Sequence, residues 1–471
     1  MSDSVKSAAK ASAKPAAKPA EPSPARLINP TVRNYMDALS LQRFYGGYQI
    51  KDVPENVFNL GIGEVGGIGL PEDLFALYGR FIASEALAPL ATRYTGTMGE
   101  RETNRLMAAH LNAWLGEERF DEWRVVSLDG GQNAVEVAVR AFTSPLGSPE
   151  HRKHYVLLAA PSYPYYSAVV AANAGLMSFL AFDGEGFTRG VETYCNPAVG
   201  LIIINVPNNP MGYALSAGQV ARIGRVAEVN DCAILVDGVY ASYADDPRVG
   251  RALAGFDAQR TVFADSFSKK YGLPGLRIGF ALSAAEELTY AMRFIKMSES
   301  LTPNNGKLAF AGHLLSHHAE LPGIIAAEVR DRRRRFLERF DPGALNGVAL
   351  MGEACNPFYL TLDIRGLSAR TGKTDAEATA HCHDHYQVRV FPGTWVYPSE
   401  SLDHATFTSA GRHNPHGPAP YLAPRFPAGA QIVYSPDHID GRVALLRLSF
   451  GAENRIEAAA EALTAALQAL R

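Results

Sequence analysis

The chain has 471 residues, of which 47% are hydrophobic, and its formal net charge at pH 7 is −3. This length is too great for one hydrophobic core and indicates two or three domains, or a large α/β body with a smaller companion. The near-neutral charge argues against nucleic acid and anionic membranes as partners, and no apolar run is long enough to span a membrane. The four cysteines are far apart and form no CxxC pair, which argues against a disulfide framework and fits a reducing cytoplasm.

The first 75 residues divide into a tail and a segment that precedes the main body. We expect residues 1–28 to be a disordered tail, because they are rich in alanine and lysine and are interrupted by four prolines between positions 15 and 24. The tail lacks the apolar region of a secretory signal, and the absence of arginine before Arg26 argues against a transit peptide. Residues 29–75 are predicted to pack with the small domain, with a helical pattern over 30–50 and an extended piece at 59–64.

Residues 76–325 are predicted to form a large α/β domain. A helical period over 100–116 is followed by strand, glycine turn and helix over 123–142, and short apolar runs then alternate with helical patterns up to residue 282. This alternation predicts βαβ units and a mostly parallel sheet of the seven-stranded type. Because ligands bind at the carboxyl ends of parallel strands, we expect the functional residues to follow the strand runs.

Residues 326–471 are predicted to form a small C-terminal α/β domain. A long charged helix over 324–340 leads into strand-like runs at FYLTLDI, YQVRVFPG and ALLRLSF. Residues 401–440 are rich in proline, glycine, histidine and serine and show no periodicity, which predicts a loop insertion. Either a lid over the site or a variable surface excursion fits this composition equally well.

The stretch SFSKKYGLPGLRIG, residues 266–279, places two adjacent lysines between a strand-like run and a glycine-rich segment. One lysine is expected to be a nucleophile, because a desolvated amine near another cation loses its proton, whereas the other could be a surface charge. Ser266, Ser268 and Arg277 are residue types that bind phosphate oxygens. A lysine and a phosphate cradle on one loop together predict an aldehyde cofactor with a phosphate group, pyridoxal 5'-phosphate.

This stretch resembles the signature of the class I/II aminotransferases of fold type I: Ser, any residue, Ser, Lys, two residues, Gly, and then Gly-x-Arg-x-Gly. The resemblance implies an α/β fold with a large cofactor-binding domain and a small C-terminal domain. It implies that Lys269 is the Schiff-base lysine and Lys270 its neighbour. It also implies an enzyme that moves an amino group between an L-amino acid and a 2-oxo acid.

Further family positions occur in the same order along the chain. Asp237, at the end of CAILVD, corresponds to the carboxylate that keeps the pyridine nitrogen protonated, and Tyr240 and Asn209 correspond to ligands of the ring oxygen. Met211 stands where the Asn-Pro-Thr-Gly element of the family has threonine. The remaining cofactor positions implied by the resemblance are the stacking aromatic Tyr163, with Tyr166 as a supporting residue, and the phosphate loop Gly130, Gly131 and Gln132.

The resemblance also implies a substrate site and a dimer. Arg447 in LLRLSFG corresponds to the arginine that binds the substrate α-carboxylate, and Gly63 corresponds to a glycine that lines the same pocket. Tyr94 in RYTGTMGE corresponds to a tyrosine that reaches the phosphate of the neighbouring subunit, which implies a homodimer with shared active sites. Tyr45 and Tyr48 are candidates for the side-chain pocket, although no sequence feature identifies the substrate.

The sequence leaves one alternative reaction open and disfavours two other classes of protein. GLPGLRIG also resembles the aminocyclopropane-carboxylate synthases, which leaves γ-elimination, replacement or cyclisation as an alternative reaction. A transcription regulator would need a DNA-binding domain ahead of the fold, and an inactive binding protein would not be expected to retain Lys269, Asp237 and Arg447. His381 and His385 are spaced to share a helix face, but without a third ligand cluster we predict no metal site. The arginine run at 330–335 lies in a helical period with glutamates and is predicted to be a solvated face.

Overall fold

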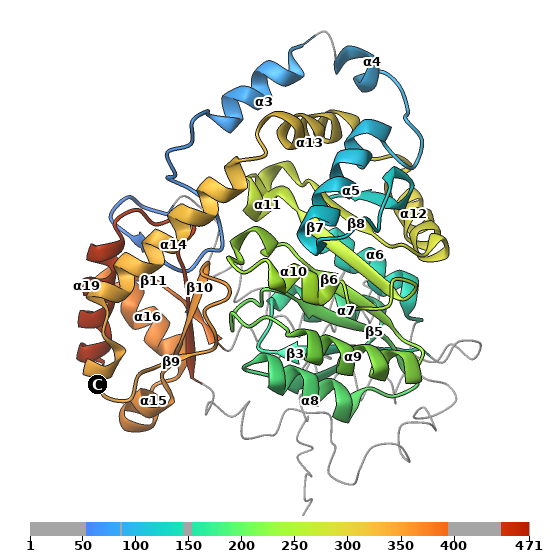
Figure 1. Ribbon diagram of the computed structural model, residues 1–471. Helices are drawn as coiled ribbons and strands as arrows, with labels where there is room; N and C mark the ends of the chain where they lie inside the picture. Colours follow the sequence, from blue (N-terminus) through green and yellow to red (C-terminus); the bar gives the residue numbers. More distant parts are fainter. Residues whose placement is uncertain (1–52, 85–86, 145–152, 394–443, 471) are drawn as a thin grey trace, which may run out of the picture.

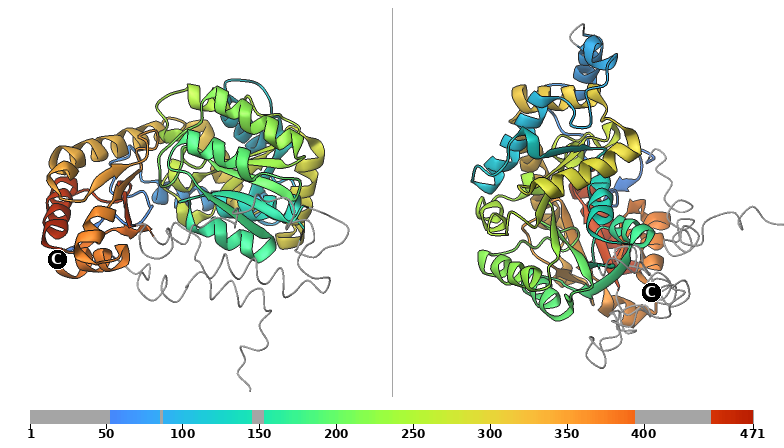
Figure 2. Two further views of the ribbon diagram at one scale, coloured as in Figure 1. Left: turned by 90° about the horizontal axis from the view of Figure 1, so that it is seen from below. Right: turned by 90° about the vertical axis from the view of Figure 1, so that its right-hand side faces the viewer.

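A computed structural model describes residues 53–84, 87–144, 153–393 and 444–470 (Figure 1). The predicted tail, the helical pattern over 30–50, Tyr45, Tyr48 and the 401–440 insertion therefore lie outside the described residues. Two bodies are visible, one built on the larger sheet and one formed mainly by the C-terminal part of the chain (Figures 1 and 2). In the described part of the chain, no helix is both long and apolar enough to cross a membrane.

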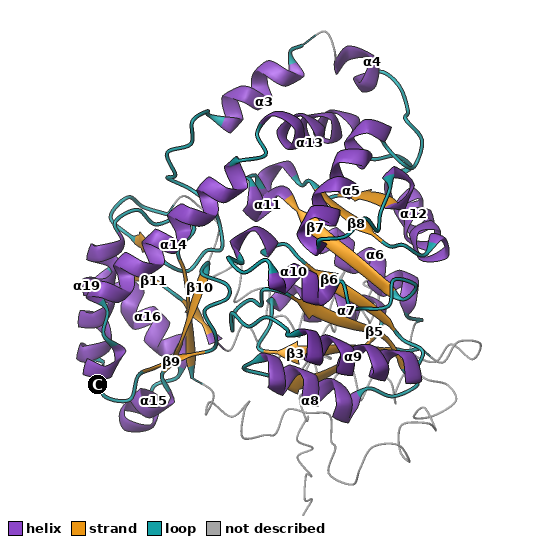
Figure 3. Ribbon diagram, viewed as in Figure 1, coloured by secondary structure: helices purple, strands orange, loops and turns teal. Residues whose placement is uncertain are grey.

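The larger body contains a seven-stranded sheet with the order β2-β8-β7-β6-β5-β3-β4, and its strands are orange in Figure 3. Only β8 runs against its neighbours, so the prediction of a mostly parallel sheet is confirmed. The strands read as continuous apolar runs because both faces of the sheet are covered. Their bounds are β2 Val125–Leu128, β3 Tyr155–Ala160, β4 Gly175–Leu180, β5 Val199–Asn205, β6 Ala233–Asp237, β7 Thr261–Ser266 and β8 Gly279–Leu282.

Helices cover both faces of this sheet, and each face has its own apolar core. One core includes residues of α5 Arg101–Leu115, α8 Gly184–Tyr194, α9 Ala217–Val229, α10 Arg248–Leu253 and α13 Asn305–His317. The other includes residues of α6 Gly131–Phe142, α7 Pro164–Asn173 and α12 Glu286–Ser300. The helices α3 Leu74–Ile82 and α4 Ala88–Ala91 lie beyond α13 at the top of Figure 1, and the four-residue α11 Phe267–Lys270 follows β7 directly. Short 3₁₀ turns complete this body at η3 Glu122–Arg124, η4 Ala241–Tyr243 and η5 Pro274–Leu276.

Local sequence signals explain where several of these elements begin and end. The helix α5 starts after Glu100, whose carboxylate accepts from two backbone N–H groups, and it stops at Gly116, which has a left-handed φ of 74°. The helix α9 has a reciprocal capping box between Ser216 and Gln219. The strand β4 begins at Gly175, one residue after Ala174, the C-cap of α7.

The smaller body is built on an antiparallel four-stranded sheet with the order β12-β13-β10-β9. The strand β1 near the start of the described chain pairs with β11, which places residues around Asn59 beside the C-terminal part. The bounds are β1 Phe58–Asn59, β9 Ala349–Met351, β10 Tyr359–Asp363, β11 Val388–Arg389, β12 Phe391–Pro392 and β13 Leu445–Ser449. The helices are α14 Leu321–Arg339, α15 Arg365–Thr371, α16 Asp375–Tyr386 and α19 Ile456–Ala469, with η6 Pro342–Ala344 between α14 and β9.

The helix α14 joins the two bodies. Leu321 in its first turn belongs to the core of the larger body, whereas Ile325 and the later buried positions belong to the core of the smaller one. The boundaries at 75/76 and 325/326 stay predictions, since the helix runs through one of them without a break.

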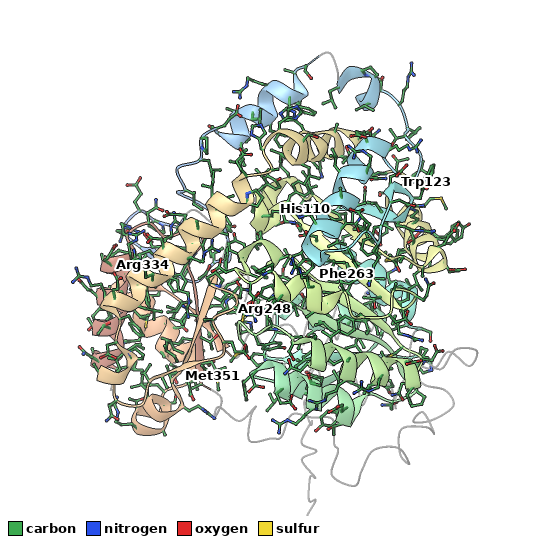
Figure 4. The ribbon with its side chains drawn as sticks, viewed as in Figure 1. His110, Trp123, Arg248, Phe263, Arg334 and Met351 are labelled. Atoms are coloured by element: carbon green, nitrogen blue, oxygen red, sulfur yellow. The ribbon has the colours of Figure 1, made fainter. Side chains whose placement is uncertain are left out.

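The arginine run in α14 is not uniformly solvated, and this part of the sequence interpretation was wrong for one residue. Arg334, labelled in Figure 4, is exposed and pairs with Asp331. Arg332 is only 1% exposed, and its guanidinium donates to the carbonyls of Gly66, Gly67 and Gly451 at 2.8–3.0 Å. Burial is tolerated because backbone oxygens and Asn454 satisfy its planar donor fork.

Candidate active site

A cavity of about 490 Å³ lies where the carboxyl ends of the parallel strands face the smaller body. Its size is that of a small-molecule or cofactor site. All the predicted site residues line it except Gly130 and Tyr94. The lining residues that come from outside the predicted set are Gly61, Ile62, Glu64, Pro164, Tyr165, Tyr166, Asn205, Val239, Pro274, Tyr359 and Phe391.

Lys269 enters the cavity from α11, which directly follows the interior strand β7. Ser266 caps this short helix, because its hydroxyl accepts from the backbone N–H of Ser268 at 3.1 Å. The Lys269 ammonium donates to the carbonyl of Gly63, which belongs to the loop after β1. Burial lowers the pKa of Lys269 to about 8, although the negative charge of Glu64 opposes that shift. The neutral, nucleophilic form of this amine is therefore far more populated near neutral pH than in an ordinary lysine, although the protonated form still predominates.

Lys270 is not a surface charge, so that possibility for the lysine pair is excluded. Its side chain is 1% exposed, points away from the cavity lining, and contacts the Asp265 carboxylate and the His110 ring. His110, labelled in Figure 4, comes from α5, and burial followed by the Lys270 charge lowers its pKa. Although burial favours the neutral acid, Lys270 and His110 hold the pKa of Asp265 below its usual range. The group is a buried ion pair beneath the helix that carries Lys269.

Asp237 ends β6 and reaches the cavity beside β7. The Tyr166 hydroxyl donates to one carboxylate oxygen, and the backbone N–H of Val239 donates to the other at 3.0 Å. Burial raises the pKa of Asp237 to about 6 despite these two donors. A cation placed against this carboxylate would oppose the effect of burial, which is the behaviour required of a partner for a protonated ring nitrogen.

Another side of the cavity presents phosphate-binding groups. Gly131 is the first residue of α6, so the free N–H groups and the positive dipole end of this helix face the site. Ser266 and Ser268 hydroxyls lie 3.0 Å apart, and Arg277 lines the same cavity. Gly130 acts behind the lining, because a Cβ on it would lie 2.5 Å from the Arg277 guanidinium and its φ is +86°.

Arg447 lies on β13, which is paired on both sides with β10 and β12 and is therefore not an edge strand. Its guanidinium donates to the carbonyl of Gly61 at 3.0 Å and to the Asn209 side-chain oxygen at 3.4 Å. The same group is held between two aromatic rings, 4.1 Å from the centre of Phe391 and 4.7 Å from that of Tyr359. Its Nε–H has no partner among the described residues. A buried cation with an unused donor is suited to a carboxylate ligand.

Two glycines of the first loop have different neighbours. Gly61 bonds Arg447, whereas Gly63, the predicted residue, bonds Lys269. A Cβ on Gly63 would also lie 2.4 Å from the Tyr359 hydroxyl, which leaves no space for a side chain there. Gly61 was missed because NLGIGE contains two equivalent glycines and no local signal distinguishes them.

Tyr163 and Tyr94 lie in contrasting surroundings. Tyr163 lines the cavity and packs edge-on against Tyr166 with ring centres 5.3 Å apart. Tyr94 is 82% exposed, and it lies outside the cavity lining. His381 and His385 have ring centres 5.1 Å apart, but the described residues contain no group of three ligands suited to a metal ion.

The fold and this site together define an α/β protein with a buried lysine at the end of a strand. Residues 56–403 match the family described as "Aminotransferase class I and II", and the chain belongs to this family. Members of the family use pyridoxal 5'-phosphate, and the cofactor prediction is confirmed at the level of the family.

Two relatives of this chain are described as aminotransferases. The probable N-succinyldiaminopimelate aminotransferase DapC of Mycobacterium tuberculosis is 33% identical over 235 residues, 48% of this chain and 56% of the relative. This chain thus spans little more than half the length of that relative. The putative aminotransferase YugH of Bacillus subtilis is 25% identical over 355 residues, 73% of this chain and 85% of the relative.

Solved structures confirm the fold. The N-succinyldiaminopimelate aminotransferase of Mycobacterium tuberculosis superposes with a TM-score of 0.66 at 23% identity, covering 96% of this chain and all of that one. An aspartate aminotransferase from Thermotoga maritima gives a TM-score of 0.65 at 18% identity, covering 93% of this chain and 98% of that one. The predicted α/β fold of type I is therefore correct.

The residues present fit pyridoxal 5'-phosphate. The hydroxyls of Ser266 and Ser268, the Arg277 guanidinium and the N-terminus of α6 suit the phosphate. Gly130 leaves room for the guanidinium, since a Cβ there would lie 2.5 Å from it. The Asp237 carboxylate suits the ring nitrogen, Tyr163 offers an aromatic face, and the Lys269 amine suits the aldehyde.

Proposed function

We propose that this protein is a pyridoxal-phosphate-dependent aminotransferase that moves an amino group between an L-amino acid and a 2-oxo acid. The observation that carries the proposal is that Lys269, Asp237 and Arg447, from distant parts of the chain, line one cavity of about 490 Å³. When bound, the cofactor supplies an electron sink for a bond at the substrate α-carbon. The named relatives are aminotransferases, which favours transamination over γ-elimination or cyclisation.

Lys269 holds and moves the proton in this proposal. With a pKa of about 8, its Nζ is deprotonated often enough to attack an aldehyde and basic enough to take the proton from the substrate α-carbon. Its contact with the Gly63 carbonyl holds Nζ beside the loop after β1, which lines this side of the cavity. Arg447 binds the α-carboxylate with a guanidinium fixed by two rings and two oxygen acceptors, so it orients the α-carbon toward Nζ.

The other residues are proposed to hold the cofactor. Asp237 stabilises a proton on the ring nitrogen, and Tyr166 orients that carboxylate by donating to it. Tyr163 covers one face of the ring, and Tyr240 and Asn209 donate to its oxygen. The phosphate set is proposed to be Gly130, Gly131, Gln132, Ser266, Ser268 and Arg277.

We also propose a homodimer with shared active sites. Tyr94 is exposed in a single chain, which supports a role in which it reaches the phosphate of a second copy. Replacement of Tyr94 by phenylalanine should then weaken cofactor binding while light scattering still reports a dimer.

A cytoplasmic location is supported by four free thiols, including Cys195 and Cys232 with sulfur atoms 3.7 Å apart.

The test is a spectral titration of the cofactor-loaded protein against a panel of amino acids. Transamination predicts conversion to pyridoxamine phosphate with release of a 2-oxo acid for at least one donor. Borohydride reduction followed by digestion should place the pyridoxyl mass on the peptide with Lys269. Lys269→Ala should abolish both signals, whereas Lys373→Ala, a change at an exposed lysine, should leave them intact. No conversion with any donor would contradict the proposal.

A further inference from the structure

The Tyr359 hydroxyl lies inside the cavity and has no role in the account above. Tyr359 is the first residue of β10, is 3% exposed, and lines the cavity. Its oxygen lies 2.6 Å from that of Tyr240, and its ring lies beneath the Arg447 guanidinium. It therefore contacts both a proposed cofactor ligand and the proposed carboxylate ligand.

The direction of the hydrogen bond between Tyr359 and Tyr240 decides whether the Tyr240 hydrogen is free for a ligand. A phenol has one hydrogen to donate and two lone pairs that accept. The Asn209 amide donates to the Tyr240 oxygen at 3.4 Å, which occupies one lone pair. If Tyr359 donates as well, both lone pairs are used and the single hydrogen of Tyr240 is free for a ligand in the cavity. If Tyr240 donates to Tyr359, that hydrogen is spent.

The charge of Arg447 selects between these two directions. Burial raises the pKa of Tyr359, but the Arg447 cation opposes that rise. Burial and the neighbouring Tyr359 hold the pKa of Tyr240 well above its usual value, and the Arg447 cation opposes that rise as well. The geometry separates the two phenols, because the guanidinium lies over the Tyr359 ring, 4.7 Å from its centre. A cation over a phenol ring strengthens the hydroxyl of that ring as a donor, so we assign the hydrogen between the two oxygens to Tyr359.

We propose that Tyr359 is a positioning residue that donates to Tyr240, and so reserves the Tyr240 hydrogen for the ring oxygen of the cofactor. The same ring seats Arg447 for the substrate carboxylate, which links the two ends of the site through one side chain. This inference rests on the proposed function. A phenylalanine would keep the ring but lose the donor, so the two roles can be separated by substitution.

The experiment compares Tyr359→Phe with wild type and with Tyr213→Phe, a buried phenol in the core of the larger body. One readout is the dissociation constant of pyridoxal phosphate. The other is the pH midpoint of the visible absorption change of the bound cofactor. Phenylalanine leaves the Tyr240 hydrogen free but removes the donor that polarises the Tyr240 hydroxyl, so the Tyr240 hydrogen bond to the ring oxygen weakens and binding should fall roughly 1.5- to 3-fold. If Tyr240 instead donates to Tyr359, the same change frees that hydrogen and binding should strengthen. The midpoint should rise by roughly 0.2 to 0.5 unit, because weaker donation from Tyr240 leaves more negative charge on the ring oxygen.

Two further variants separate positioning from a general structural effect. In a Tyr240→Phe background, Tyr359→Phe should change neither readout further, because the acceptor of its hydrogen is gone. Tyr359→Leu should in addition raise KM for the amino donor, since it removes the ring beneath Arg447, whereas Tyr359→Phe should change KM less than roughly twofold. Additive effects of the two phenylalanine changes would overturn the proposal.

The outcomes also distinguish this inference from the proposed function. Wild type that fails to take up the cofactor would refute the proposed function together with this inference. Wild type that binds and transaminates, beside a Tyr359→Phe protein with unchanged affinity and midpoint, would refute this inference alone. A similar loss in Tyr213→Phe would also refute it, because the effect would then not be specific to position 359.

Discussion

Replacing Lys270 with methionine tests whether the buried ion pair beneath α11 holds the larger body together. The side chains of Lys270 and Asp265 are 1% and 2% exposed, so the change leaves a carboxylate that water cannot reach. Its remaining partners are the Ser266 N–H at 2.6 Å and the His110 ring at 3.5 Å. Removing one member of such a pair costs about 3–5 kcal/mol of unfolding free energy.

The loss should depend on pH, with a sign that follows from His110. In the wild type, burial and the Lys270 charge lower the pKa of His110. In the variant the Lys270 charge is gone and Asp265 remains, so the folded-state pKa of His110 rises. A raised histidine pKa adds stability below its unfolded value of about 6.5, and this stability is lost as the pH rises through the folded-state pKa. The variant should therefore lose more stability at pH 8.5 than at pH 5.5.

Urea unfolding at a fixed cofactor concentration measures this, with Lys296→Met as the matched control. Lys296 is 5% exposed but its partner Asp129 is 48% exposed, so water can solvate the carboxylate left behind. We expect that control to cost about 1 kcal/mol or less. Adding Asp265→Leu to Lys270→Met should recover much of the loss, because both charges are then absent. Equal costs for the two lysine variants at pH 8.5 would refute the reasoning.

Three further predictions concern the site. Incorporation of pyridoxal phosphate into the apoprotein should speed up with pH, with a midpoint near pH 8 and a plateau about one unit higher, because burial lowers the pKa of Lys269 to about 8; a rate still rising at pH 10 would contradict it. Arg447→Lys should raise KM for the amino donor roughly 10- to 100-fold by removing a planar fork, whereas Arg334→Lys on the exposed face of α14 should not, and steady-state kinetics checks both. Asp237→Asn should retain the cofactor but slow turnover at least roughly 100-fold, measured in single-turnover reactions; an unchanged rate would exclude a role for its charge.

The sequence by itself was sufficient for the features that are local. The period of the apolar residues predicted the alternation of strands and helices. The residue types between Ser266 and Gly279 predicted a nucleophilic lysine and phosphate-binding side chains on one loop. Parallel strands bring their carboxyl ends to one edge, so residues that follow strands could be expected to meet. In the structure Asn209, Asp237 and Lys269 line one cavity.

Only the tertiary structure decided the contacts between distant segments. Tyr359 and Tyr240 are 119 positions apart, and Arg447 and Gly61 are 386 apart. The spacing of residues along the chain does not predict these contact partners, because packing between the two bodies determines them. Lys270 and Arg332 show the same limit: each resembles a surface charge in the sequence, yet each is buried because distant acceptors surround it. A charged residue's exposure is set by what the fold places against it, and the chain's own neighbours do not contain that information.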